Sequence, residues 1–141
     1  MCPLNKEQID KLVAAAWEGQ KNAYAPYSHF KVGAAVLGED GVIYNGCNIE
    51  NASYGLTNCA ERTAIFKMVS TGCTKFLGLV VVAGDEPGQS GPCGACRQVI
   101  SEFALDVNTT PIISAGRNGE MVIEPVIALY PRPFMKFEAN E

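Results

Sequence analysis

The stretch Leu77-Gly-Leu-Val-Val-Val-Ala83 decides the fold, because it contains no polar side chain. A strand with one face in water alternates between apolar and polar residues, whereas a strand that is buried on both faces is apolar throughout. Residues 77–83 therefore predict a central strand with protein packed against both of its faces.

Helices are predicted both before and after this strand along the chain. Residues 5–22 and 58–70 carry apolar residues at three- and four-residue steps, which is the spacing of an amphipathic helix. Residues 94–103 form a third helical segment, which follows the loop 84–92. Helices around a buried strand indicate an α/β protein.

Four further strands complete the predicted sheet. Residues 30–37 and 42–47 predict a hairpin around the turn 39–41, and residues 112–115 and 121–123 predict two later strands around Asn118-Gly119. The proline-rich tail should hold only a short turn or helix. We therefore expect one domain over residues 1–141, a three-layer α/β/α architecture with a five-stranded mixed sheet.

The composition excludes several classes of partner. The chain has 141 residues and a formal net charge of -4, which disfavours broad electrostatic binding to a nucleic acid polymer or an anionic membrane. No apolar stretch approaches the roughly 20 residues that span a bilayer, and residues 1–10 lack the features of a signal peptide. We expect a soluble, cytoplasmic protein.

The cysteines carry the first indication of function. In a reducing compartment the six cysteines are interpreted as free thiols or metal ligands. Cys59-Ala-Glu61 and Pro92-Cys-Gly-Ala-Cys96 each begin a predicted helix, where the helix dipole favours thiolates. Thiolates from Cys59, Cys93 and Cys96 would give zinc three protein ligands and leave its fourth position for water, as in a catalytic site.

Two charged residues beside Cys59 suit that chemistry. Glu61 could exchange a proton with the water molecule and the substrate, provided that Cys59 lies at the helix cap, outside helical geometry. Three thiolates leave the zinc site with a net negative charge, and Arg62 could offset it by donating N–H groups to the sulfurs.

Each residue also has a simpler explanation. A structural zinc completed by Cys47, or buried thiols without a metal, would account for the cysteines. Glu61 alone would be a favourable acid in the first helical turn, and Arg62 alone a solvated side chain. Together, however, Cys-x-Glu followed by Pro-Cys-x-x-Cys matches the three-cysteine form of the zinc deaminase signature.

Over nearly the whole chain the sequence resembles the small, homotetrameric, zinc-dependent cytidine deaminases. The resemblance rests on the blocks 24–35, 46–51, 59–64 and 92–98, which stand in the family's order. It implies one zinc ion per subunit and hydrolysis of cytidine and deoxycytidine to uridine and deoxyuridine, with release of ammonia.

The resemblance also implies the substrate-binding residues. Asn48 and Glu50 would hold the sugar 3′-hydroxyl, and they point the same way if the segment is extended. The family pattern further implies that Phe30, as the first residue of its strand, lines the pyrimidine pocket together with Ala60. It implies that Tyr54 and Phe134 complete a neighbouring subunit's pocket. It also implies that Gln98 lies near the zinc thiolates. An ordinary core aromatic would explain Phe30, and a polar helix surface would explain Gln98, without any function.

One segment departs from the family pattern. The chain has Leu129-Tyr-Pro-Arg-Pro-Phe134 where relatives usually have Leu-Leu-Pro, two small residues and Phe.

Alternative functions are a deaminase of a related aminopyrimidine nucleoside or nucleoside antibiotic, a polynucleotide-editing deaminase, and a non-catalytic zinc module. A 3′-phosphate would meet the charge of Glu50, which argues against a polynucleotide.

Overall fold

The computed structural model describes residues 2–135. Its elements are α1 (Lys6–Gln20), β1 (Gly33–Gly38), β2 (Ile43–Cys47), η1 (Tyr54–Leu56), α2 (Ala60–Ser70), β3 (Phe76–Val82), α3 (Gly94–Phe103), β4 (Pro111–Ala115), β5 (Met121–Pro125) and α4 (Val126–Leu129). The strands form one five-stranded sheet in the order β2-β1-β3-β4-β5. Only the pair β3–β4 is parallel, so the sheet is mixed, as expected.

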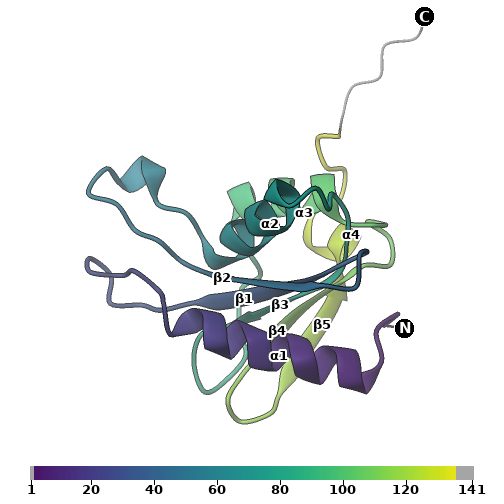
Figure 1. Cartoon of the computed structure of the whole chain (residues 1–141), viewed down its shortest axis with the longest axis horizontal. Helices are drawn as coiled ribbons and strands as arrows, with labels where there is room; N and C mark the ends of the chain where they lie inside the picture. Colours follow the sequence, from purple (N-terminus) through teal and green to yellow (C-terminus); the bar gives the residue numbers. More distant parts are fainter. Residues whose placement is uncertain (1, 136–141) are drawn as a thin grey trace, which may run out of the picture.

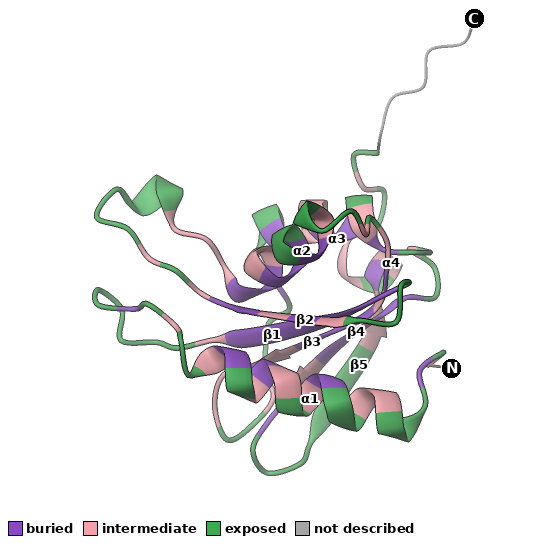
Figure 2. Ribbon diagram, in the orientation of Figure 1, coloured by how far each residue is buried: buried purple, intermediate pink, exposed green. Residues whose placement is uncertain are grey.

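The sheet lies between two helical layers (Figure 1). Helix α1 covers one face, and α2, α3 and α4 lie over the other. Side chains of β3 alternate between the two cores: Leu79 packs on the α2–α3 side and Val80 on the α1 side. Figure 2 shows the buried residues concentrated on the central strands and on the inner faces of the helices. The predicted central strand and three-layer architecture are confirmed.

Glycines let the helices approach the sheet closely. A Cβ at Gly33 would lie 2.0 Å from the Ala16 carbonyl oxygen of α1, and a Cβ at Gly46 would lie 2.5 Å from the Ala64 nitrogen of α2. Either distance is too short for a real side chain. The two glycines thus set the separation between the β1–β2 hairpin and its covering helices.

The prediction that a strand begins at Phe30 is wrong, because β1 begins at Gly33. The Asn48 side chain accepts a hydrogen bond from the Val32 amide at 2.9 Å and donates one to the Phe30 carbonyl at 2.7 Å. These backbone groups therefore pair with a side chain and not with a neighbouring strand. His29 also has a positive φ of 59°, which interrupts an extended chain just before Phe30.

Candidate active site

The two cysteine motifs meet at the amino-terminal ends of two helices. Cys59 is the N-cap residue of α2, with φ -73° and ψ 157°, and Cys93 is the N-cap residue of α3, with φ -63° and ψ 167°. Both residues are extended and lie outside helical geometry, as the sequence-based role of Glu61 beside Cys59 requires. Because β3 leads into α3, the parallel β3–α3–β4 crossover carries Cys93 and Cys96 to the end of the central strand.

The sulfur atoms of Cys59, Cys93 and Cys96 all lie within 4.8 Å of one another. Tetrahedral zinc with Zn–S bonds of about 2.3 Å places its sulfur ligands about 3.8 Å apart. The Cys59 and Cys93 sulfurs are 3.7 Å apart, far beyond the length of a disulfide bond. The cluster therefore fits zinc in its spacing and in the chemistry of its donor atoms.

The three sulfurs differ in exposure. Cys96 is buried, Cys59 is half-buried and Cys93 is exposed. Hydrogen bonding from Cys96, together with Arg62 and Cys93, lowers the pKa of the Cys59 thiol, while the same contact raises the pKa of Cys96. Without a metal, Cys96 thus holds its thiol proton more tightly than Cys59 holds its own. Zinc binding would remove these protons, since the thiolate is the form that ligates the metal.

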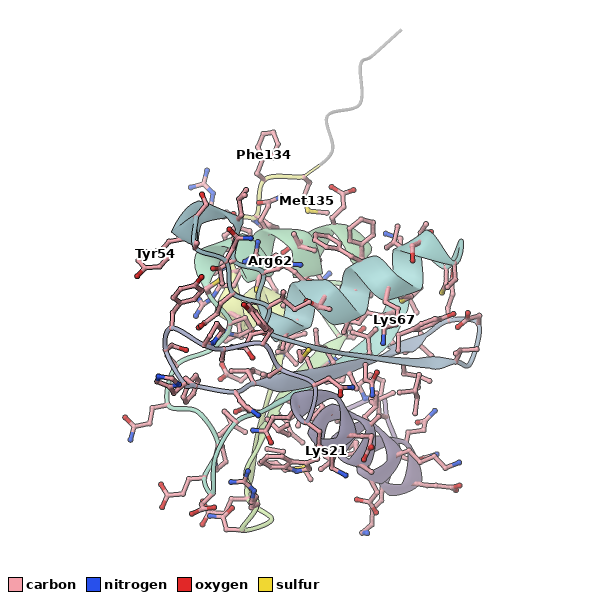
Figure 3. The ribbon with its side chains drawn as sticks, turned by 60° about the vertical axis from the view of Figure 1, so that its left-hand side comes forward. Lys21, Tyr54, Arg62, Lys67, Phe134 and Met135 are labelled. Carbon is pink, nitrogen blue, oxygen red and sulfur yellow. The ribbon has the colours of Figure 1, made fainter. Side chains whose placement is uncertain are left out.

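Arg62 lies against this cluster from the first turns of α2. Its guanidinium donates a hydrogen bond to the Cys59 sulfur at 3.3 Å, which is the contact expected from the sequence. Its Nε atom is buried and has no hydrogen-bond partner among the described residues. Figure 3 shows Arg62 lying within the body of the protein. A fixed positive charge here offsets part of the negative charge of three thiolates.

Glu61 is almost completely enclosed, with only 6% of its surface exposed. Burial raises the pKa of its carboxyl group to about 7, because water no longer stabilises the charged form. Glu61 also lines a cavity of about 180 Å³ together with Phe30, Val32 and Pro92. A carboxyl group with this pKa can accept and donate protons near neutral pH.

Asn48 and Glu50 lie in an extended segment beside the loop that carries Phe30, but both side chains already bind protein. Asn48 bonds the backbone at Phe30 and Val32. Glu50 accepts hydrogen bonds from the Tyr27 and Ser28 amides and from the Ser28 hydroxyl. The Ser28 hydroxyl is the main cause of the lowered pKa of Glu50, because its hydrogen bond stabilises the ionised carboxylate.

The remaining predicted residues lie toward the outside of the site. Phe30 is 60% exposed, Tyr54 on η1 is 76% exposed and Phe134 is 77% exposed. Figure 3 shows Tyr54 and Phe134 pointing away from the body of the protein. The Tyr54 ring contacts the Tyr27 ring edge-on, at a centroid distance of 6.0 Å. Ala60, in contrast, is fully buried at the start of α2.

Gln98 contacts the carboxyl-terminal segment. Its side chain donates to the Phe134 carbonyl at 2.6 Å and accepts from the Tyr130 hydroxyl at 2.8 Å. Within residues 2–135, none of its hydrogen bonds goes to the three sulfurs. The unusual Tyr130 is therefore tied to the position of Phe134.

Three polar side chains near the site were not predicted from the sequence. Ser28 hydrogen-bonds Glu50, Tyr130 hydrogen-bonds Gln98, and Ser114 lines the cavity beside Glu61. Ser28 belongs to the proline-containing stretch 24–28 that ends the first helical segment, and Tyr130 belongs to the segment that departs from the family pattern, so the sequence marked both places. Ser114, inside a short strand, had no such mark.

Comparisons with known proteins agree with this geometry. A model of the cytidine and deoxycytidylate deaminase zinc-binding region matches residues 6–119. A cytidine deaminase of Sporosarcina psychrophila is 50% identical over 91% of this chain and 92% of its own length. A blasticidin-S deaminase of Bacillus cereus is 33% identical over 96% of this chain and 99% of its own length.

Solved structures give the same result. The crystal structure of cytidine deaminase from Burkholderia pseudomallei superposes with a TM-score of 0.81 at 41% identity, covering 93% of this chain and 100% of that chain. None of the helices within residues 2–135 is long and apolar enough to cross a membrane. By sequence, fold and metal-site geometry, the chain belongs to the cytidine and deoxycytidylate deaminase family.

Proposed function

We propose that this protein hydrolyses cytidine and deoxycytidine to uridine and deoxyuridine with release of ammonia, using one zinc ion per subunit. The observation that carries the proposal is the cluster of Cys59, Cys93 and Cys96 beside the buried Glu61. When bound, zinc would supply a Lewis acid that activates water for attack on the ring carbon bearing the amino group.

The protein's own groups move the protons. Glu61 accepts one proton from the attacking water and passes it to the adjacent ring nitrogen. It then takes the second proton of that water, which is now on the hydroxyl bonded to the ring carbon, and transfers it to the departing amine while the carbonyl forms. A carbon–oxygen bond forms and the carbon–nitrogen bond breaks, so ammonia leaves. Because Glu61 is buried, it can hold a proton without competition from bulk water.

Other residues place the nucleoside. Phe30 lines the cavity beside Glu61, where its ring can pack against the pyrimidine. The Ala60 amide belongs to the first turn of α2, where N–H groups have no partner within the helix, so it can donate to a ring carbonyl. We assign Asn48 and Glu50 to the sugar 3′-hydroxyl, and Gln98 to the support of the metal site through α3.

We further propose that the active protein is a homotetramer in which Tyr54 and Phe134 complete pockets of neighbouring subunits. Both aromatic side chains are about three-quarters exposed in the single chain, as is the adjacent Leu56. Exposed apolar groups of this size favour burial against a partner. Sedimentation should give the mass of four chains, whereas a monomeric active enzyme would refute the proposal.

A reducing compartment, such as the cytoplasm, is the proposed location. All six cysteines are unpaired in the structure, including those outside the metal cluster. A protein with many free thiols suits a compartment in which disulfides are kept reduced.

A second candidate substrate is a nucleoside antibiotic that carries an aminopyrimidine ring. The similarity to a blasticidin-S deaminase along nearly the whole chain favours testing this candidate. The decisive experiment follows the loss of cytidine absorbance together with stoichiometric uridine and ammonia, before and after zinc is removed with a chelator. We expect zinc-dependent turnover of cytidine at a higher kcat/KM than blasticidin S; the reverse order would assign the antibiotic as substrate.

A further inference from the structure

The loop 84–92, which joins β3 to the Cys93 motif, forms one wall of the cavity beside Glu61. Gly88, Ser90, Gly91 and Pro92 all line this cavity of about 180 Å³. The same four residues also line a second cavity of about 260 Å³, which extends toward Glu120 and Glu124. Because the loop borders two cavities, close packing alone does not hold it in place.

Hydrogen bonds hold the two ends of the loop. At its start, the Gly84 and Asp85 carbonyls accept from the Arg117 and Asn118 amides at 3.1 and 2.9 Å. At its end, the Pro92 carbonyl accepts from the Arg97 side chain at 2.6 Å. The attachment at Arg97 fixes the chain next to Cys93.

A single side chain holds the middle of the loop. The Ser114 hydroxyl accepts a hydrogen bond from the Gly88 amide at 2.9 Å. It is the one hydrogen bond that residues 86–91 make to the rest of the described chain. Ser114 lies on β4, a rigid strand of the sheet, and it lines both cavities.

We propose that Ser114 is a positioning residue, whose hydroxyl holds Gly88 and thereby sets the width of the pocket next to Glu61. Without the hydroxyl the loop gains freedom toward the second cavity, and the pocket loses a fixed wall. The metal cluster is not affected, because Arg97 holds Pro92 independently. The consequence for the substrate rests on the proposed deaminase function.

The test compares Ser114→Ala with Ser114→Thr, which retains the hydroxyl. Ser70→Ala is the control, because Ser70 also hydrogen-bonds backbone but lies at the exposed end of α2. The zinc-loaded proteins are measured for hydrogen exchange at the Gly88 amide, zinc content, melting temperature, and kcat and KM for cytidine.

We expect Ser114→Ala to raise both the exchange rate at Gly88 and the KM about fivefold, the factor given by a hydrogen bond of typical net strength. The kcat and the zinc content should stay at the parental values, and Ser114→Thr and Ser70→Ala should behave like the parent.

Three results would overturn the inference: unchanged exchange at Gly88 in Ser114→Ala, a Thr variant that behaves like the Ala variant, or a fall in kcat together with loss of zinc. If the parent itself does not deaminate cytidine, the proposed function fails, while exchange at Gly88 still decides whether Ser114 holds the loop.

Discussion

The metal cluster and the outer rim of the pocket differ in how much of each is buried within a single chain. At the cluster, Cys96 is fully buried, Glu61 is 6% exposed, and Arg62 bonds the Cys59 sulfur. At the rim, Tyr54 and Phe134 expose most of their surfaces. A single chain therefore buries the cluster but leaves these two aromatic side chains open to solvent. If both regions act as proposed, one chain is enough to place the reacting groups, whereas enclosing the substrate requires a neighbouring subunit. Changes at the cluster should therefore act on kcat and changes at the rim on KM.

The largest effect is expected from Glu61→Gln. The amide preserves the shape of the side chain but cannot accept the proton, so kcat should fall about 10²- to 10⁴-fold. Zinc content, measured by metal analysis, should stay at one ion per chain. Glu102→Gln, at an exposed position of α3, provides the control. Parental turnover by a zinc-loaded Glu61→Gln protein would contradict the assigned mechanism.

Arg62→Gln should have the next largest effect, a reduction of kcat by about 10- to 100-fold. The loss of the guanidinium leaves the net negative charge of zinc and its three thiolates uncompensated and weakens the metal as a Lewis acid. KM should change little, since Arg62 contacts a ligand and not the substrate. Steady-state kinetics on zinc-saturated protein checks this, and unchanged turnover would remove the proposed role.

Glu50→Gln should act on KM at the rim. A charge-assisted hydrogen bond to the sugar hydroxyl would be lost, so KM should rise about tenfold. Parental KM would separate Glu50 from the substrate and leave it a purely structural role in the loop.

The same variant has a pH-dependent effect on folding. The folded-state pKa of Glu50 lies below its ordinary value of 4.5, mainly because of the Ser28 hydroxyl. Its contribution to stability is thus fully present above about pH 4.5 and is lost as the pH falls through the folded-state pKa. The difference in unfolding free energy between parent and Glu50→Gln should shrink over that range; a difference that grows on acidification would contradict this sign.

Phe134→Ala should have the smallest effect, an increase in KM of several-fold with kcat preserved, because one apolar contact at an exposed rim is lost. Mixing Phe134→Ala chains with Glu61→Gln chains tests whether Phe134 acts in its own pocket or in a neighbouring subunit's pocket. If Phe134 acts in a neighbouring pocket, some mixed pockets combine an intact Glu61 with an intact Phe134, so KM should partly recover. A mixture that shows only the Phe134→Ala behaviour would place Phe134 in its own chain's pocket.

Much of the architecture could be predicted, because burial leaves a direct trace in local sequence. The apolar stretch 77–83 predicted a central strand, and the bounds of α3 were predicted correctly as 94–103. The error at Phe30 arose because its backbone bonds Asn48, a residue that lies 18 positions away. Local periodicity contains no information about such a contact.

The candidate site likewise combines residues that could be predicted from the sequence with contacts that could not. Cys59, Glu61, Cys93 and Cys96 form a local signature, so the metal chemistry could be predicted from spacing at two helix starts. The roles of Asn48 and Glu50 in organising the loop 27–32, and the contact of Gln98 with Tyr130, could not be predicted. These bonds join segments whose proximity depends on the path of the whole chain.

By itself, the sequence determined the kind of sheet, the donor atoms of the metal site and the carboxyl group next to them in the chain, because each follows from residue type and short-range spacing. Only the tertiary structure decided that Arg62 reaches the Cys59 sulfur, that Glu61 is buried enough to shift its pKa, and that Ser114 holds the loop at Gly88. Distances and burial are set by how separate elements pack, and that packing depends on all the elements together.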